Sequence, residues 1–315
     1  MGYSMTLRDA RRATFLEARA DDRLRQLGLV SVVVPAFNEE TAIGHDLDTI
    51  LATLDAVGVE YEVIVVDDGS TDRTAEEVRC RPRVRLVRHP VNLGVGAARK
   101  TGMRMARGNI IITTDGDGTY PNHEMPRLLA ELADYDMVVG ARRQEAGTLR
   151  WLRAPAKTAI RWLASSLAGT RIPDLNSGLR CFRKDTAERF LPLLPQGHSW
   201  ESTITLAFLT NGYTVKYVPV DYYPRRGGSS SFHPLRDTFN TLRLVFRIVF
   251  YFYPLRVLGP VAFLLVLLGG MKLVRDGISD HFHVSGSTVM IILTGIHLAV
   301  LGVIADLIIK RSGRL

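Results

Sequence analysis

The sequence is poor in cysteine: Cys80 and Cys181 are the only two among 315 residues, and neither lies in a CxxC pair or in a cluster with histidine. This scarcity argues against a disulfide framework and against a zinc site built on thiolates. Two reduced thiols in a cytosolic domain are the simplest interpretation.

The sequence also lacks an apolar run near its N-terminus. Residues 1–27 are crowded with charged side chains, whereas a signal peptide needs an uninterrupted apolar core. We therefore expect the chain to begin in the cytosol, and we interpret residues 1–28 as a helical extension.

No nucleic-acid recognition motif accompanies the formal net charge of +8. We therefore do not expect nucleic acid as a partner. Many of the arginines lie close to the apolar C-terminal region, so an anionic membrane surface or an anionic ligand is the better explanation of the positive charge.

The last quarter of the chain contains two apolar stretches, 253–274 and 287–309. Each has about 20 residues, the length that crosses a bilayer core. Basic residues precede the first stretch and follow the second, so the positive-inside rule places both ends of a hairpin, 253–315, in the cytosol. Two buried core helices are the alternative, although a domain of this size could hardly cover both. Residues 234–252 mix arginine with large apolar side chains, as a helix in the membrane interface does.

From residue 30 onward, short apolar strands alternate with helices. The predicted strands cover 30–34, 61–66, 84–88, 110–114 and 214–220, and the predicted helices cover 40–57, 72–80, 94–107 and 200–211. This alternation predicts an α/β domain over residues 29–233, with a mostly parallel, Rossmann-like sheet covered on both faces. The strand 214–220 is expected at an edge. Such sheets bind ligands beyond the carboxyl ends of their strands.

Polar turns follow three of these strands. Asp115 and Asp117 come one residue apart after an Ile/Thr strand, and two such carboxylates can hold Mg²⁺ or Mn²⁺, which bridges diphosphate oxygens. Asp68, in Asp-Asp-Gly-Ser, could accept a hydrogen bond from a nucleotide base or simply cap the next helix. The segment 35–40 could offer an aromatic face to the base or only start a helix.

Six motifs in order carry a resemblance to a known family: VVVPAFNEE, VIVVDDGSTD, NLGVGAARKTG, TTDGDGTYP, LNSGLRCFR and YYPRRGGSSSF. Together they resemble the inverting family 2 glycosyltransferases of the polyprenyl-phosphate type, which include dolichol-phosphate mannose synthase and bacterial polyprenyl-phosphate glucosyltransferases. The resemblance runs from about residue 30 to 235. It implies a nucleotide-diphospho-sugar transferase (GT-A) fold.

The resemblance also implies roles for individual residues. The nucleotide-sugar would be bound by Pro35, Phe37, Glu39, Asp68 and Asp115; the metal would be held by Asp115 and Asp117; phosphate would be met by Arg180, Arg225 or Arg226, and Ser229. Two positions depart from the family pattern. Thr119 stands where mannose synthases carry glutamine, and Ser230 and Ser231 replace a lysine, so water or the donor would complete the metal's coordination and arginines would carry more of the acceptor phosphate.

The implied reaction moves a sugar from a nucleotide-sugar, with a UDP-sugar favoured over GDP-mannose, onto polyprenyl or dolichyl phosphate. The acceptor phosphate is already anionic, so alignment and charge stabilisation matter more than a strong base. Glu201 is a candidate helper or a structural helix residue. We expect a multi-pass protein of the cell (plasma) membrane with its catalytic domain in the cytoplasm, and the hairpin could also pack against copies of itself as a homo-oligomer.

Three other readings remain open. A processive polysaccharide synthase would share the fold, but it normally carries a Q-x-x-R-W motif and more spans, which this sequence does not show. A glycosyltransferase with a soluble or protein acceptor would not need the hairpin. A non-catalytic membrane scaffold would not need intact Asp68, Asp115 and Asp117. The sequence does not disclose which sugar is moved.

Overall fold

The computed structural model of the chain describes residues 24, 27–143, 165, 169–197, 199–225, 250, 254–279 and 284–312. The chain divides into two compact units, Met1–His233 and Pro234–Leu315. Nearly all of the predicted N-terminal extension and of the predicted interface helix lies outside the described residues. So do two of the predicted site residues, Arg226 and Ser229.

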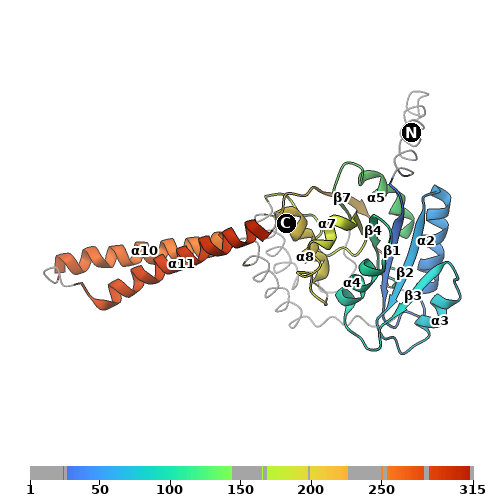
Figure 1. Ribbon diagram of the computed structural model, residues 1–315, viewed down its shortest axis with the longest axis horizontal. Helices are drawn as coiled ribbons and strands as arrows, with labels where there is room; N and C mark the ends of the chain where they lie inside the picture. The colour runs from blue at the N-terminus through green and yellow to red at the C-terminus, as the bar shows by residue number, and fades with distance from the viewer. Residues whose placement is uncertain are drawn as a thin grey trace, which may run out of the picture. The chain divides into compact units, whose positions relative to one another are not determined.

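The first unit is built on a seven-stranded sheet with the order β3-β2-β1-β4-β6-β5-β7 (Figure 1). The strands are β1 (Val30–Ala36), β2 (Tyr61–Asp67), β3 (Val84–Arg88), β4 (Ile110–Thr113), β5 (Met137–Arg142), β6 (Arg180–Arg183) and β7 (Val215–Val220). All paired strands run parallel except β6, which is antiparallel to both β4 and β5. The predicted fold class and the edge position of the last strand are therefore confirmed.

Strand register brings the loops of interest to one edge. Ala36 at the end of β1 lies opposite Asp67 at the end of β2, and Val33 lies opposite Thr113 at the end of β4. β1 and β2 therefore end at the same level, whereas β4 ends three residues earlier along β1, and all three strands open at the same edge of the sheet. The turns that follow them, which the sequence marked as polar, start side by side.

Helices cover both faces of the sheet. They are α2 (Ile43–Val57), α3 (Thr74–Arg79), α4 (Val95–Met105), the 3₁₀ turn η1 (Asn122–Glu124), α5 (Met125–Glu131), α7 (Lys184–Glu188) and α8 (Trp200–Thr210). β1 is buried along its whole length because successive side chains meet different helices. Val33 lies against Gly102 of α4, whereas Val34 belongs to the core cluster that contains Ile43 of α2. Figure 1 shows α2 and α4 on opposite sides of β1.

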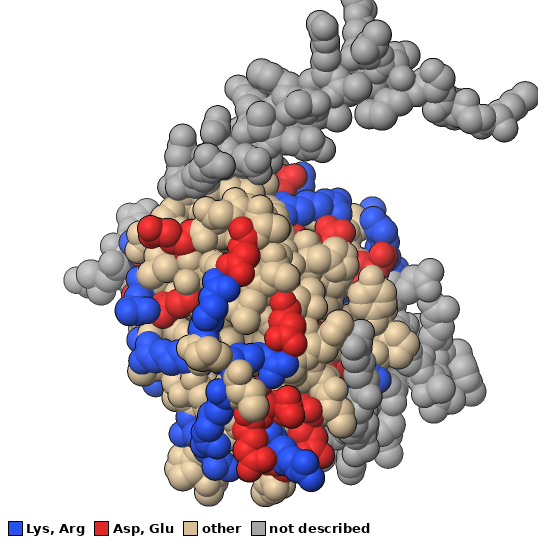
Figure 2. Space-filling model, turned by 90° about the vertical axis from the view of Figure 1, so that its right-hand side faces the viewer, with Lys and Arg blue, Asp and Glu red and all other residues tan. Residues whose placement is uncertain are grey.

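The outer face that carries α2 and α3 holds charges of both signs, interspersed rather than separated (Figure 2). Arg81 pairs with Asp48 at 2.8 Å and Arg83 with Asp55 at 2.6 Å. These exposed pairs connect α2 to the segment that leads into β3, and each contributes less than about 1 kcal/mol to stability.

The second unit is a hairpin of two long helices, α10 (Pro254–Ser279) and α11 (Gly286–Ser312). Both are long and apolar enough to cross a membrane, and only 11% and 17% of their most apolar windows are buried inside the structure. Two buried core helices would be covered, so the lipid-facing alternative is favoured. Gly269 and Gly295 let the helices approach closely, since a Cβ there would lie 2.5 Å from Ile292 and 2.7 Å from Val266, respectively.

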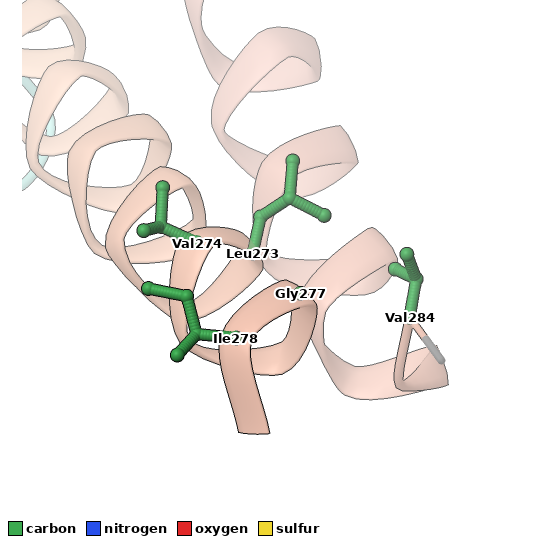
Figure 3. Close-up of a pocket in the computed structure, with 5 residues that line it drawn as sticks. All are labelled: Leu273, Val274, Gly277, Ile278 and Val284. Atoms are coloured by element: carbon green, nitrogen blue, oxygen red, sulfur yellow. The ribbon is translucent and has the colours of Figure 1, made fainter. Parts of the chain in front are cut away.

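A polar cluster closes the hairpin at its turn. Asp276 of α10 accepts hydrogen bonds from Thr288 Oγ1 at 2.5 Å and from Ser285 Oγ at 2.9 Å, and Lys272 Nζ donates to Thr288 Oγ1 at 2.9 Å. Each polar side chain of this cluster is thereby matched with a partner from the other helix or the turn. Beside this cluster an apolar hollow of about 310 Å³ lies at the end of α10 (Figure 3), lined by Leu273, Val274, Gly277, Ile278 and Val284.

Candidate active site

The loops that follow β1, β2 and β3 are fastened to one another. Asn38 N–H donates to Ser70 Oγ at 3.0 Å, which joins the first loop to the second. Gly69, with φ of +77°, lies so close to the third loop that a Cβ would be 2.7 Å from the carbonyl carbon of Val91. Only glycine fits this turn without strain. The three loops therefore form one continuous rim along the carboxyl edge of the sheet.

Asp68 supports this rim from the inside. Its carboxylate accepts hydrogen bonds from the backbone N–H groups of Leu93 at 3.0 Å and Gly94 at 2.8 Å, and it lies 2.7 Å from His89 Nδ1. The residue is 2% exposed. These contacts use most of its acceptor positions on the loop after β3. The predicted contact of Asp68 with a base stays a prediction, and the contacts favour a role in shaping the loop.

Two more predicted members of the nucleotide pocket lie at the end of β1 and at the start of the loop that follows it. Pro35 is buried inside β1, and Phe37, directly after the strand, is 41% exposed with its ring open to a ligand. A stacked base is the ligand that the sequence predicts there.

The turn that carries the acidic pair is held by Asp46 of α2. Gly118 N–H donates to Asp46 Oδ2 at 2.8 Å, and Asn122 Nδ2 donates to Asp46 Oδ1 at 3.2 Å. Within the turn, Thr119 Oγ1 donates to Asp117 Oδ1 at 2.6 Å. Thr119 therefore orients Asp117 through one oxygen and leaves Oδ2 for other ligands.

Three carboxylates and one arginine share the open side of this turn. Arg225, which follows β7, forms an ion pair with Glu39, and its Nε lies 3.7 Å from Asp117 Oδ2. Burial raises the pKa of Asp117 above its usual range, and the nearby charge of Asp115 adds to the rise. Burial likewise raises the pKa of Glu39 to about 7, with Arg225 opposing the shift and Asp117 and Asp115 adding to it. The three carboxyl groups on this side of the turn therefore outnumber the single positive charge of Arg225.

A divalent cation suits this arrangement. Carboxylate oxygens are the ligands that Mg²⁺ and Mn²⁺ prefer, and a cation beside Asp115 and Asp117 would relieve their repulsion. Within the described part of the chain no group of three or more His, Cys, Asp or Glu side chains is arranged to hold a metal by itself. The remaining ligands would have to be donor phosphate oxygens and water, as is usual for Mg²⁺ with nucleotides.

Arg180 departs from its predicted position. The side chain is fully buried, and its Nη1 donates to Glu201 O at 3.0 Å and to Thr205 Oγ1 at 2.8 Å, while Nε donates to Ser177 O at 3.1 Å. Burial lowers the pKa of this guanidinium. The contacts tie the loop before β6 to α8. Its placement does not support the predicted contact with phosphate.

The structure instead brings a second arginine to the acidic turn. Arg99 of α4 is 1% exposed; its Nη2 donates to Asp115 Oδ1 at 2.6 Å and its Nη1 to Glu201 Oε1. The sequence offered one signal for it, the position of Arg99 inside the NLGVGAARKTG motif. The motif does not indicate which side of α4 faces the end of β4. Glu201, left open as helper or structural residue, lies behind Arg99.

The titration of Glu39 gives a first testable consequence. Its pKa rises from an ordinary 4.5 to about 7 in the folded chain. Between these values the folded state binds a proton that the unfolded state does not, so this contribution to stability is lost as pH rises through the interval. Glu39→Gln is therefore expected to raise the unfolding temperature at pH 8 by a few degrees and to change it little at pH 5. Thermal scans of both proteins in EDTA measure this, and an equal gain at both pH values would contradict the assignment.

A close approach at Gly178 gives a second consequence. A Cβ there would lie 2.7 Å from Asp115 Oδ2, although the backbone conformation itself suits any residue. Gly178→Ala is expected to shift the carboxylate and lower activity about 10- to 100-fold, because small misplacements at a reacting site are costly. Gly197→Ala, with nothing within 4 Å of the added Cβ, is the matched control. Equal kcat/KM values for the two variants would refute the steric argument.

Two family models match the chain. Residues 31–184 match the family described as Glycosyl transferase family 2, and residues 253–310 match the one described as GtrB C-terminal hairpin. The first match spans the sheet from β1 to β6 with the acidic turn, and the second spans the two long helices.

Curated relatives agree with these matches. An undecaprenyl-phosphate 4-deoxy-4-formamido-L-arabinose transferase of Edwardsiella ictaluri (strain 93-146) is 31% identical over 256 residues, which cover 78% of this chain and 75% of that protein. The protein of the same name from Pseudomonas paraeruginosa (strain DSM 24068 / PA7) is 30% identical over 256 residues, covering 78% and 70%, respectively.

Solved structures share the fold. Glucosyl-3-phosphoglycerate synthase from Mycobacterium tuberculosis in complex with phosphoglyceric acid superposes with a TM-score of 0.57 at 22% identity, over 73% of this chain and 81% of that one. The same enzyme in complex with Mn²⁺, UDP and glucosyl-3-phosphoglycerate gives a TM-score of 0.57 at 21% identity, with the same coverage. At this identity the likeness concerns the fold alone.

Proposed function

The chain belongs to glycosyl transferase family 2, among its polyprenyl-phosphate glycosyltransferases, and on this basis we propose that it transfers a sugar from a UDP-sugar to polyprenyl phosphate with inversion at the anomeric carbon. The products are a polyprenyl-phosphate-sugar and a nucleoside diphosphate. The observation that carries the proposal is the acidic turn at the end of β4, where Asp115 and Asp117 lie beside Arg225.

The donor would lie along the rim of the sheet. Phe37 offers an exposed ring for the base, and the loop held by Asp68 borders the same side. A divalent cation held by Asp115 and Asp117, when bound, neutralises charge on the diphosphate leaving group. Glucosyl-3-phosphoglycerate synthase, which shares this fold, has been solved with Mn²⁺ and UDP bound, and this supports the choice of nucleotide and metal.

The transfer itself needs little proton chemistry. An oxygen of the acceptor phosphate attacks the anomeric carbon, the bond from that carbon to the β-phosphate oxygen breaks, and the electron pair leaves with the nucleoside diphosphate. The acceptor is anionic at pH 7, so no strong base is required. Arg225 is placed to meet phosphate because its guanidinium already lies at the mouth of the acidic turn, and its planar fork binds phosphate oxygens in pairs.

The hairpin supports a lipid acceptor over a soluble one. Its helices have outward-facing apolar side chains along both candidate spans. We place both ends of the hairpin and the catalytic unit on the cytoplasmic side of the plasma membrane, because basic residues flank the spans on that side. The acceptor's phosphate would then be available at the same surface.

An acceptor comparison tests the proposal. The purified full chain would be given Mn²⁺ and a panel of donors, UDP-hexoses, UDP-4-deoxy-4-formamido-L-arabinose and GDP-mannose, with either undecaprenyl phosphate or 3-phosphoglycerate. Transfer to the lipid alone is expected, and NMR of the product should show the anomeric configuration opposite to that of the donor. Transfer only to 3-phosphoglycerate would overturn the acceptor, and retention of configuration would overturn the mechanism.

A further inference from the structure

A buried ion pair lies directly behind the acidic turn. Arg99 of α4 and Glu201 of α8 are 1% and 7% exposed and bond to each other. The other end of the guanidinium donates to Asp115 Oδ1 at 2.6 Å, and the ring of Trp200 lies 5.3 Å from its Cζ. Two helices from distant parts of the chain thus meet at one carboxylate of the proposed metal site.

Glu201 changes what Arg99 does to Asp115. A buried guanidinium needs a counter-charge, because removing it from water is costly. Glu201 supplies that charge inside the protein. Asp115, whose side chain is 30% exposed, therefore does not have to neutralise Arg99 and keeps negative charge for a ligand on its open side.

The orientation of Asp115 is fixed from two directions. Oδ1 is held by Arg99, and Oδ2 lies against Gly178, where a Cβ would be only 2.7 Å away. Gly178 is itself held, since its N–H donates to Tyr120 Oη at 2.7 Å. The carboxylate has little freedom to rotate, as a preformed ligand requires.

The Arg99–Glu201 pair leaves some of its buried polar atoms without hydrogen-bond partners, which a pair placed only for stability would not do. Among the described residues, buried side-chain atoms without a hydrogen-bond partner are Asp67 Oδ2, Arg99 Nε, Trp200 Nε1, Glu201 Oε2 and Tyr217 Oη. Two of these five atoms belong to the Arg99–Glu201 pair itself, and a third belongs to Trp200, whose ring lies against Arg99. Unsatisfied buried groups reduce stability, so their concentration beside a functional carboxylate needs another reason.

We infer that Arg99 and Glu201 are positioning residues that hold the Asp115 carboxylate in the orientation that binds a divalent cation together with a nucleoside diphosphate. The inference deepens the proposed function and rests on one part of it, the binding of a metal and UDP at this turn. It does not depend on the acceptor or on the sugar.

Metal affinity in matched variants tests the inference. The variants are Arg99→Met, Glu201→Gln and the double variant, each as the full chain in detergent. Binding of Mn²⁺ in a fixed excess of UDP would be followed by the EPR signal of free Mn²⁺, and folding by the thermal unfolding temperature. Partners behind metal ligands change affinity about 10- to 100-fold, so we expect all three variants to bind Mn²⁺ at least about tenfold more weakly.

The double variant separates positioning from stability. Each single variant leaves a buried charge unpaired and should lower the unfolding temperature, whereas the double variant removes both charges and should recover it. Affinity for Mn²⁺ should nevertheless stay low, because Asp115 has lost its donor. Recovery of affinity to within twofold of the parent in the double variant would overturn the inference.

Two further comparisons complete the test. Arg99→Lys keeps the charge and should retain more affinity than Arg99→Met; equal affinities would contradict the role of the charge. Glu62→Gln is the control: this carboxylate bonds to Ser31 Oγ at 2.7 Å at the opposite end of the strands, so the variant should lower stability without changing Mn²⁺ affinity.

Failure of the parent to bind Mn²⁺ with UDP would also overturn the inference. A parent that binds Mn²⁺ and UDP but transfers no sugar to lipid would refute the proposed function and leave the inference standing.

Discussion

Replacement of Asp117 by asparagine is expected to lower sugar transfer about 1,000-fold or more while leaving the unfolding temperature close to that of the parent. Asparagine keeps the shape and can still accept the hydrogen bond of Thr119 Oγ1, which is 2.6 Å from Asp117 Oδ1. It removes the charge that the proposed cation needs, and loss of about 4 kcal/mol of charge stabilisation corresponds to that factor. Steady-state kcat/KM with saturating lipid measures the effect.

Asp48→Asn is the matched control for this variant. Asp48 is an exposed carboxylate on α2 that pairs with Arg81 at 2.8 Å, on the outer face of the domain. Its replacement should leave kcat/KM unchanged within about twofold, because exposed pairs contribute little. Near-normal sugar transfer by the Asp117→Asn variant would contradict the proposal that Asp117 binds the divalent cation.

Replacement of Arg225 by alanine has the second largest expected effect, a loss of about 100-fold or more in kcat/KM. The guanidinium is the cation that faces Glu39 and Asp117 on the open side of the turn. Without it, donor or acceptor phosphate loses a paired contact of the kind that contributes 10²- to 10³-fold, roughly, to charge-stabilised reactions. Burial already raises the pKa of Glu39 to about 7, and losing Arg225 would raise it further, so Glu39 would be largely protonated at neutral pH.

Two variants make this result specific. Arg225→Lys keeps the charge without the planar fork and should fall between the parent and alanine. Arg143→Ala removes an exposed arginine that pairs with Asp221 at 3.1 Å and should act as an unaffected control. The sequence left open whether Arg225 or Arg226 meets phosphate. Arg225 lies 3.7 Å from Asp117 Oδ2, whereas Arg226 is outside the described residues. We expect the larger loss from Arg225→Ala, and a larger loss from Arg226→Ala would reverse that choice.

Local pattern predicted those parts of the fold that neighbouring residues determine. β1 and β2 are short β-branched runs buried on both sides, so their alternation with helices was readable from the sequence. β5 (Met137–Arg142) was not predicted. It contains a glycine, and its partners β6 and β7 lie far along the chain, so long-range pairing rather than local preference makes it a strand. The direction of β6 was unreadable for the same reason.

The candidate site divides in a similar way. Asp115 and Asp117 were predicted because a turn directly after a strand must lie at the carboxyl edge. Arg180 was expected to meet phosphate, but packing of β6 against α8 encloses it. Arg99 was not predicted at all, because it sits within a helix and only the approach of α4 to the end of β4 brings it to Asp115. The positions of these two side chains depend on tertiary contacts, which the local spacing of residues does not predict.

The hairpin follows from composition alone. Apolar stretches of bilayer length specify two spans whether or not the first unit is considered. The polar cluster of Lys272, Asp276 and Thr288 at the turn was less predictable, because its residues lie in both helices and meet only when the hairpin closes.

The measurement that tests the central claim most directly is the transfer of label from a UDP-sugar into a lipid extract. Purified full chain, undecaprenyl phosphate and radiolabelled donors would be incubated with Mn²⁺, or with EDTA instead, and extracted with organic solvent. The account predicts label in the organic layer from one donor with Mn²⁺, none with EDTA, and none from the Asp117→Asn variant. A folded protein that leaves every donor's label in the aqueous layer, or that labels the lipid equally well in EDTA, would contradict it.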